Sequence, residues 1–482
     1  MPQMLLAMPR VRRAAGLVSA VLLAICLIPA MASAQAAPSA VSPTPAVNAT
    51  GTAAAVAVAP ATAATASAAA PASTFKTDSG DTAWMLVSTA LVLMMTIPGL
   101  ALFYGGMVRK RNVIATVAQS FAITAVATLV WFVAGYSVAL GTDPSTWANN
   151  WWGGLGNVFL KQVSMTKSYT IAGTVLTIPE YVYMMYQMTF AIITPALICG
   201  AFAERFKFSA LLLFTVLWSL FVYAPIAHWV WGGGFLGGLG VMDFAGGTVV
   251  HVNAGVAGLV CALVVGKRRG YGHDNMAPNN LVYTMIGASL LWVGWFGFNA
   301  GSALGANALA GVAMANTQVA TAAATIAWMA VEWFHRKKPT LLGLASGAVA
   351  GLVAITPASG FVTPCGALWI GLIAGAVCYC SAVFLKNALK YDDSLDAFGV
   401  HGVGGFVGAI LTGVFADAGI NTLPKGHGVL VQFESCIVTI VWTAVVTFLI
   451  LMVCKFTTGL RVTEEEEVYG LDLALHGEAM HD

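Results

Sequence analysis

Charged side chains are scarce in this sequence. Asp, Glu, Lys and Arg make up only 9% of the 482 residues, whereas hydrophobic residues make up 59%. Because a soluble domain carries roughly 25% charged residues, this composition excludes an ordinary soluble enzyme and indicates an all-α polytopic membrane protein. The formal net charge is only +2, so it gives no sign of a nucleic-acid partner.

Cysteine patterns that would indicate a disulfide or zinc framework are also missing. The eight cysteines form no CxxC pair and no Cys/His spacing typical of a metal site. Most of them lie within or beside apolar segments, so we expect them to act as small core residues. No nucleophile and base are arranged as in an enzyme, and the sequence predicts neither a metal nor a cofactor.

The N-terminus has the pattern of a secretory signal. Three arginines precede an apolar run at 17–28, and small residues at 32–34 supply a cleavage pattern, which predicts a signal peptide at 1–34. Residues 35–77 are almost wholly Ala, Pro, Thr, Ser and Val. Such a segment has too few large side chains to form a core, so we expect it to be disordered and extracytoplasmic.

Apolar runs of about 20 residues alternate with short polar joints along the rest of the chain, as spanning helices require. We expect a membrane domain at 78–456 and a cytoplasmic C-terminal tail at 457–482. Eleven transmembrane helices are predicted, near 81–108, 112–141, 178–203, 207–228, 245–266, 279–300, 305–334, 340–357, 364–385, 397–416 and 428–456.

Basic residues gather at alternate joints. By the positive-inside rule these joints are cytoplasmic, which places the mature N-terminus outside and the C-terminus inside. The opposite joints and the segment before the first span hold only Lys76, Lys161, Lys167 and Lys425. The basic clusters are Arg109-Lys110-Arg111, Arg205 with Lys207, Lys267-Arg268-Arg269, Arg336-Lys337-Lys338, Lys386 with Lys390, and Lys455 with Arg461.

One motif occurs twice, once in the predicted fifth span and once in the tenth. The two copies are Asp243-x7-His251-x3-Gly255-x2-Gly258 and Asp393-x7-His401-x3-Gly405-x2-Gly408. The predicted topology makes these spans antiparallel, as in an inverted repeat of five plus five helices with one helix added. Glycines on the histidine face allow close approach of two backbones. We therefore expect His251 and His401 to meet near the middle of the membrane.

Three interpretations of the paired histidines compete. They could form a structural hydrogen bond in the core, hold a metal, or line a conduction path. A metal site needs three or four ligands, and no carboxylate or thiolate lies near either histidine at helical spacing. A pore for a small hydrogen-bonding solute fits best, because two neutral imidazoles that share a proton offer both a donor and an acceptor.

Aromatic residues gather at the predicted outer ends of the spans. Runs of this kind are AHWVWGGG at 227–234, GWFGFNAGS at 294–302 and YQMTF at 186–190. Most tryptophans of a membrane protein belong to the interfacial belt. These runs also suit a cation vestibule, since a desolvated cation–π contact contributes about 1–2 kcal/mol.

At this point the sequence resembles the ammonium transporter family (Amt/Mep/Rh), in particular its bacterial Amt type, over about residues 80–480. Together the matching stretches are specific to that family. They are IPGLALFYGG (97–106), AFAERFKFSA (201–210), AHWVWGGG (227–234), DFAGGTVVHVNAG (243–255), GWFGFNAGSA (294–303), FGVHGVGG (398–405) and GLRVTEEEEVYGLD (459–472).

The resemblance implies a role for each matching position. Trp231, Ser302 and Phe190 would form an outer ammonium-binding site, with Phe190 and Phe298 stacked below it as a gate. His251 and His401 would line the pore. Asp243 would support the binding site without touching the ion, and both it and Asp393 also suit helix caps.

The resemblance further implies ammonium uptake across the cytoplasmic (inner) membrane. The ion would be bound outside, lose its proton and cross as ammonia past the two histidines, with possible transfer of the proton as well. Alternatives are an ammonium sensor that signals through its tail and, less well supported by the residues, a neutral gas channel. Implied partners are a homotrimer, a PII-type nitrogen regulatory protein at the cytoplasmic face and the lipid bilayer.

Two features depart from the family pattern. The external segment at about 141–177 is longer than is typical of bacterial members, so it has the length to cover the vestibule. Tyr186 stands beside the predicted gate, at a position where the family varies.

Overall fold

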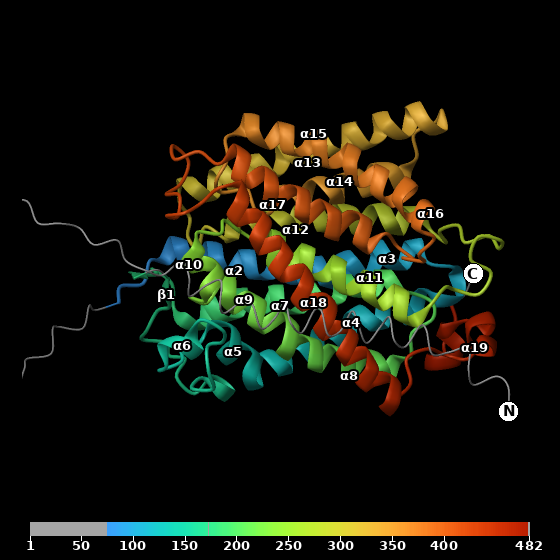
Figure 1. Ribbon diagram of the computed structural model, residues 1–482, viewed down its shortest axis with the longest axis horizontal. Helices are drawn as coiled ribbons and strands as arrows, with labels where there is room; N and C mark the ends of the chain where they lie inside the picture. The colour runs from blue at the N-terminus through green and yellow to red at the C-terminus, as the bar shows by residue number, and fades with distance from the viewer. Residues whose placement is uncertain (1–74, 172, 481–482) are drawn as a thin grey trace, which may run out of the picture. The chain divides into compact units, whose positions relative to one another are not determined.

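The computed structural model describes residues 75–171 and 173–480. The predicted signal peptide, and the predicted disordered segment up to residue 74, lie outside the described residues. Residues 75–480 form one unit built almost entirely of helices (Figure 1). The prediction of an all-α fold is confirmed.

The helices of this unit are as follows. They are α2 (Ser79–Met94), α3 (Ala101–Met107), α4 (Val113–Val130), α5 (Tyr136–Leu140), α6 (Thr146–Asn149), α7 (Glu180–Phe202), α8 (Phe208–Trp218), α9 (Ala224–Trp231), α10 (Phe235–Leu239), α11 (Asn253–Val265), α12 (Leu281–Gly301), α13 (Ala308–Arg336), α14 (Leu341–Ile355), α15 (Pro364–Cys380), α16 (Lys386–Leu389), α17 (Val403–Phe415), α18 (Val429–Thr457) and α19 (Glu464–Tyr469). Two short antiparallel strands, β1 (Thr170–Ile171) and β2 (Thr174–Val175), form a hairpin.

Several of these helices join into longer spans through single π-helical turns. Within the described residues, ten spans are long and apolar enough to cross a membrane, and α14, with 15 residues, is a shorter apolar helix. These eleven segments correspond in order to the eleven predicted ones. The π turns lie at Met95–Leu100, Trp131–Gly135, Ser219–Tyr223, Gly247–Val252, Ser381–Leu385, Phe398–Gly402 and, in the tail, Asp472–His476.

Side-chain caps fix where many helices begin. Asp78, Asn280, Asn307, Thr340 and Thr363 each precede a helix and accept a hydrogen bond from a backbone N–H group in its first turn. These caps satisfy N–H groups that have no partner within the helix. Short polar joints thus start these five helices, α2, α12, α13, α14 and α15, at a defined residue.

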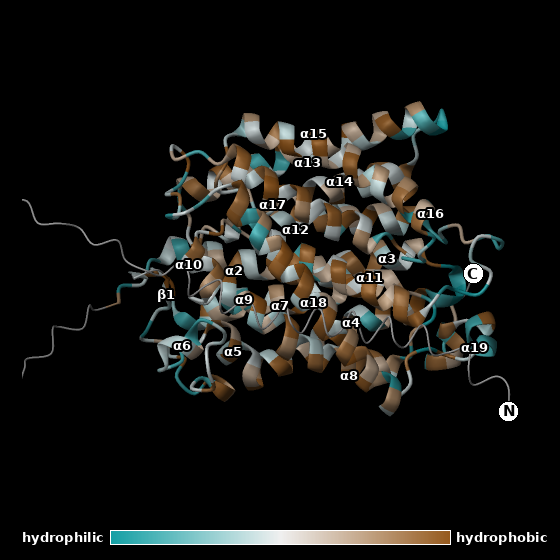
Figure 2. Ribbon diagram, in the orientation of Figure 1, coloured by the Kyte–Doolittle hydropathy of each residue, from teal (hydrophilic) through white to brown (hydrophobic). Residues whose placement is uncertain are grey.

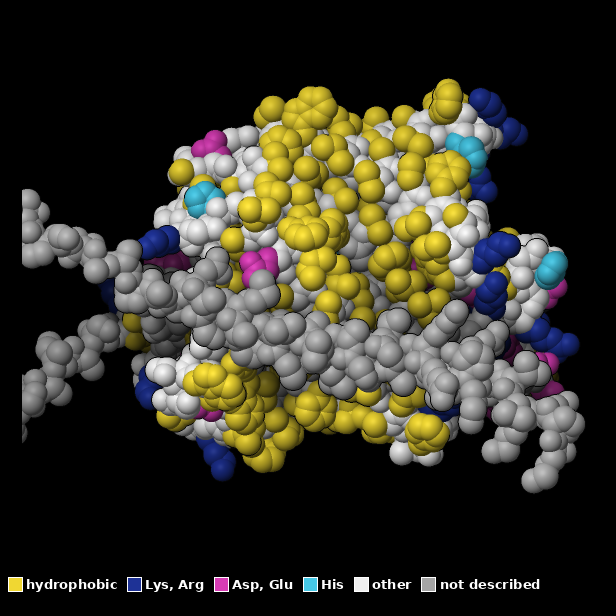
Figure 3. Space-filling model, in the orientation of Figure 1, with side chains coloured by type: hydrophobic (Ala, Val, Ile, Leu, Met, Phe, Trp, Pro, Cys, Tyr) yellow, Lys and Arg dark blue, Asp and Glu magenta, His cyan; other side chains and the backbone are white. Residues whose placement is uncertain are grey.

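α7 is the most deeply buried span and lies at the centre of the unit. It packs against α2, α4 and α11, while α13, α14 and α15 pack on one another at one side (Figure 1). Hydrophobic residues fill the middle of the helices and polar residues collect at their ends (Figure 2). On the surface, a broad band of hydrophobic side chains separates the two ends (Figure 3), as expected where lipid tails would contact the protein.

The two ends of the unit differ in character. We call the end that carries the hairpin and Trp231 the aromatic end. We call the opposite end, which carries Arg205, Arg268 and the tail helix α19, the basic end; the two lie at the left and right of Figure 1 respectively.

Candidate functional site

The two repeated histidines lie against one another in the core. His251 belongs to the π turn before α11 and His401 to the π turn before α17. Their rings stack with centroids 5.4 Å apart and an angle of 20° between the ring planes. Both residues are almost closed to solvent, with exposed fractions of 1% and 3%. Neither ring nitrogen of His251 has a hydrogen-bond partner among the described residues, so the pair offers polar atoms to a small solute.

Glycines bring the two histidine segments together. A side chain at Gly255 would collide with the backbone of Gly402. At Gly405, a Cβ atom would lie 2.8 Å from the carbonyl oxygen of Gly247 and 2.9 Å from Cβ of His251. The glycines that follow each histidine therefore leave no room for another residue, as the repeat predicts.

Aromatic rings continue the line from the histidines toward the aromatic end. Trp295 stacks on His251 with centroids 5.3 Å apart, and its indole N–H donates to Thr356 Oγ1 at 2.9 Å. Phe298 lies 6.0 Å from the His251 ring. The Phe190 and Phe298 rings lie against one another with centroids 4.3 Å apart and an angle of 34° between the ring planes. The Phe190–Phe298 pair thus separates the histidines from the space above.

Above the phenylalanine pair lies a cavity that we call the vestibule. Its wall includes Trp231, Ser302, Tyr186 and Phe190. The Trp231 ring meets the Phe190 ring edge to face, 5.8 Å away at 82°. Ser302 Oγ donates to the Phe298 carbonyl oxygen at 2.9 Å, which leaves its own lone pairs to accept a hydrogen bond. The vestibule therefore combines aromatic rings with a hydroxyl acceptor.

Tyr186 orients the serine of the vestibule. Its hydroxyl lies 2.9 and 2.8 Å from the carbonyl oxygens of Gly297 and Phe298, to which it donates. It also lies 3.2 Å from Ser302 Oγ. Tyr186 is buried, so this phenol ties α7 to the end of α12 where the serine and the gate residue both lie.

Asp243 lies in the wall of the vestibule and acts as a helix cap. Its carboxylate accepts from the backbone N–H groups of Gly246, Gly247, Thr248 and Val249 at 2.5–3.1 Å and from the Thr248 hydroxyl at 2.6 Å. Its carbonyl oxygen accepts from the Trp231 indole N–H at 2.9 Å. The residue therefore orients both the His251 segment and the indole.

The repeat partner of this aspartate also caps a helix. The Asp393 carboxylate accepts from the N–H groups of Ala397 and Phe398 at 3.0 and 2.7 Å, at the start of the His401 turn. Burial, together with the nearby carboxylate of Asp396, raises the pKa of Asp393 above its ordinary value. Both aspartates of the repeat thus position the histidine that follows them.

Comparisons with known proteins place this geometry in a family. A model of the Ammonium Transporter Family matches residues 83–481. The chain belongs to the ammonium transporter family. An ammonium transporter of Aquifex aeolicus is 52% identical over 416 residues, 85% of this chain and 95% of that protein. One of Bacillus subtilis is 49% identical over 408 residues, 83% of this chain and 98% of that protein.

Solved structures of the family share the fold. The crystal structure of Saccharomyces cerevisiae Mep2 superposes with a TM-score of 0.75 at 34% identity, covering 81% of this chain and 89% of that one. A structure titled "Sensor Amt Protein" superposes with a TM-score of 0.75 at 30% identity, covering 82% of this chain and 98% of that one. These matches confirm the resemblance on which the sequence analysis relied.

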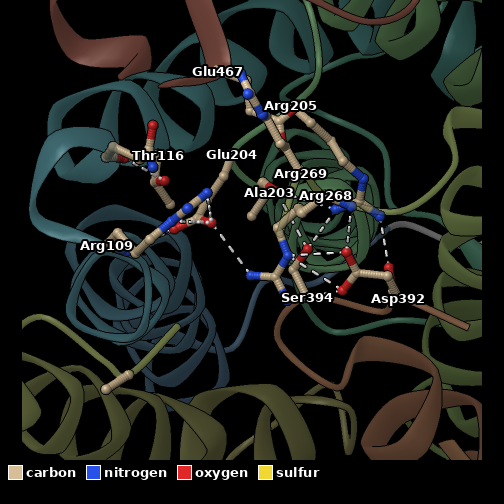
Figure 4. Close-up of polar contacts among 12 residues, drawn as sticks. Arg109, Thr116, Ala203, Glu204, Arg205, Arg268, Arg269, Asp392, Ser394 and Glu467 are labelled. Atoms are coloured by element: carbon tan, nitrogen blue, oxygen red, sulfur yellow. Dashed lines mark hydrogen bonds and ion pairs between the residues drawn. The ribbon is translucent and has the colours of Figure 1, made fainter. Parts of the chain in front are cut away.

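A network of buried charges at the basic end of this ammonium transporter family member was not predicted. Arg268 lies between two carboxylates, with contacts of 3.3 Å to Glu204 and 2.8 Å to Asp392 (Figure 4). Arg109 Nη2 lies 2.8 Å from the same Glu204 oxygen. Burial alone would raise the pKa of Glu204, but its arginine partners lower it. The pKa of Asp392 is likewise lowered, because Arg268 outweighs burial.

Arg205 connects several segments of the basic end through hydrogen bonds. Its guanidinium is fully buried and donates to the carbonyl oxygens of Ala201, Ala203, Gly266 and Asp392 and to the Ser394 hydroxyl. These groups come from the last turn of α7 and from the segments after α7, α11 and α16. One side chain therefore joins three connections at the basic end.

The tail packs on the same end. Arg461 pairs with Glu467 at 2.6 Å, and Glu467 accepts from the Arg269 N–H group at 2.7 Å. Asp472 accepts from the Ala115 N–H group at 2.8 Å, at the start of α4. Within the acidic run Glu464–Glu467, the last carboxylate is thus buried and paired with an arginine, while Glu464 and Glu465 are exposed.

Each residue predicted to form the site lies on the line that we have described. Trp231, Ser302 and Phe190 meet in the vestibule, Phe298 lies below it, and the two histidines follow. Trp295 was not predicted as a site residue, although it stands three residues before Phe298 on α12. In the described part of the chain, no cluster of three His, Cys, Asp or Glu side chains is arranged for a metal ion.

Proposed function

We propose that this protein carries ammonium across the cytoplasmic membrane, and that the line from Trp231 to His401 is its path. The observation that carries the proposal is the stacked pair of buried histidines beneath an aromatic vestibule. Membership of the ammonium transporter family supports the choice of substrate.

In the first step the vestibule binds the ammonium ion. The faces of Trp231 and Phe190 attract the cation, and the Ser302 oxygen accepts one of its N–H hydrogen bonds. A desolvated cation–π contact contributes about 2 kcal/mol. This combination favours a small, weakly hydrated cation with hydrogen-bond donors.

In the second step the ion loses its proton at the gate. Transfer of an intact ion into an apolar pore forfeits hydration worth on the order of tens of kcal/mol in the low-dielectric limit. Ammonia avoids that penalty because it is neutral. It would pass the Phe190–Phe298 pair and exchange hydrogen bonds with the unpartnered ring nitrogens of His251.

The released proton has two possible routes, which differ in the net charge that crosses the membrane with each ammonium. If it returns to the outer solution, transport is neutral. If the imidazoles of His251 and His401 relay it inward, each ammonium moves one charge. We favour the relay, because the stacked pair provides two proton-accepting rings in sequence.

Recording on proteoliposomes during ammonium pulses tests the function. We expect a transient inward current that scales with the ammonium gradient and is absent with potassium. A sensor is the second candidate, favoured by the docking of the tail on α4 and by the likeness to a structure titled as a sensor. Saturable ligand binding without any flux would favour the sensor over the transporter.

We also propose the surroundings that the family implies. The protein would lie in the inner membrane with its aromatic end outside and its tail in the cytoplasm, after removal of residues 1–34. The placement of most basic clusters at the end that carries the tail supports this orientation. A homotrimer and a PII-type regulator at the basic end complete the proposal. Cross-linking in native membranes would test the trimer.

A further inference from the structure

The long segment between α5 and α7 reaches over the vestibule. Ile171, in strand β1 of its hairpin, lines the same cavity as Trp231 and Ser302. The hairpin keeps its register through the pairs Thr170 with Val175 and Ile171 with Thr174. Ile171 thus joins Val230 and Leu304 as an aliphatic residue in the wall of a cavity whose other lining residues are aromatic or polar.

Contacts on both sides fix this hairpin in place. Before β1, Tyr169 stacks on Tyr183 of α7 with centroids 4.3 Å apart and an angle of 16°. The Tyr169 hydroxyl donates to the Leu140 carbonyl oxygen at 2.9 Å. After β2, the Thr177 carbonyl oxygen accepts from the Asp78 N–H group at 2.9 Å, and the Thr177 hydroxyl bonds the Asp81 carboxylate. The segment is therefore tied to α5, α7 and the start of α2.

Isoleucine has little freedom to move away at such a position. A β-branched side chain is stiff at χ1, and the backbone that carries Ile171 is held at both ends. The Ile171 side chain offers no lone pair to an N–H donor and no ring face to a cation. What the side chain does provide is bulk in the cavity wall that also carries the groups proposed to bind the ion.

We propose that Ile171 is a specificity-determining residue that limits the size of the cation entering the vestibule. The inference rests on the proposed function. Ammonium fits between the rings and Ser302, whereas the methyl groups of an alkylated ammonium need the volume that Ile171 occupies. The hairpin thus discriminates between ammonium and its methylated forms before either reaches the gate.

The test compares Ile171→Ala with wild type in proteoliposomes. We expect the ratio of the constants with which dimethylammonium and ammonium inhibit methylammonium uptake to fall by about tenfold. A change of this size is typical when a hydrophobic pocket gains or loses one or two methylenes. Ile171→Phe should raise the same ratio. Val175→Ala is the matched control, because this residue lies on the same hairpin, is exposed and does not line the cavity.

Equal changes for both cations, or no change, in Ile171→Ala would overturn the proposal, since a merely structural role would not alter the ratio. Thermal stabilisation of the detergent-solubilised protein by each cation gives the same ratio without any flux. If wild type shows no flux, the proposed transport fails, while the stabilisation ratio still decides the role of Ile171.

Discussion

Replacing Asp243 by alanine tests whether its carboxylate supports the structure of the site or binds the ion directly. The carboxylate accepts four backbone N–H groups and one hydroxyl, and it is 6% exposed. Each hydrogen bond to a charged group contributes about 1.5–3 kcal/mol. The sum is an upper limit, because the adjoining vestibule lets water reach some of the freed donors. We therefore expect Asp243→Ala to lower the free energy of unfolding by about 3–5 kcal/mol.

Denaturant titration in mixed micelles measures this loss. Asp243→Asn should lose about half as much, because one of the two acceptor oxygens remains. Asp417→Ala is the control, since that carboxylate is exposed and accepts a single local hydrogen bond from Gly419. The reasoning is refuted if Asp243→Ala unfolds within about 1 kcal/mol of wild type and yet loses ammonium binding, because the carboxylate would then be a ligand.

Three further predictions concern the close packing and the basic end. Gly255→Ala should lower the free energy of unfolding by about 1–3 kcal/mol through overpacking. The control Gly311→Ala should not lower it, because a Cβ there meets nothing within 4 Å. Equal melting midpoints of the two variants would contradict close packing at Gly255. Glu204→Gln should cost about 3 kcal/mol, because it leaves buried arginines short of a carboxylate; an unchanged unfolding curve would contradict it. Asp472→Ala should cost about 1 kcal/mol at the start of α4 and speed proteolysis of the tail; unchanged cleavage would contradict the cap.

Acid sensitivity follows from the same charges. The pKa values of Glu204 and Asp392 in the folded protein lie below their ordinary values of 4.5 and 3.8. A lowered pKa contributes stability that is present above the ordinary value and is lost as the pH falls through the folded value. The denaturant concentration at the unfolding midpoint should therefore fall when the pH is lowered below 4.5. In Glu204→Gln this fall should be smaller. A midpoint that is independent of pH in both proteins would contradict the ion-pair account.

Hydropathy predicted the spans because a membrane helix must bury about 20 residues in lipid, which is a local property. The predicted fourth span ended at His228, but the helix continues to Trp231. The break therefore comes only at Gly232–Gly234, where α10 follows. Glycine-rich joints made that boundary hard to place from the sequence alone.

The repeated motif predicted the meeting of the histidines because both copies have the same spacing of Asp, His and Gly. The sequence could not show that π turns carry them, since a π turn depends on packing that has no periodic signal. The contacts of Arg205 and Arg268 join segments far apart in the chain, so no local pattern could reveal them. The same holds for Ile171, whose place in the vestibule depends on how a loop folds back.

Removal of both imidazoles tests whether the solute passes His251 and His401. Methylammonium uptake and ammonium-evoked current are recorded in proteoliposomes that carry wild type or the double variant His251→Ala, His401→Ala. If the imidazoles carry the solute, we expect the variant to fold but to lose the current or to pass potassium as well as ammonium. Wild-type uptake that remains selective against potassium in the double variant would contradict it.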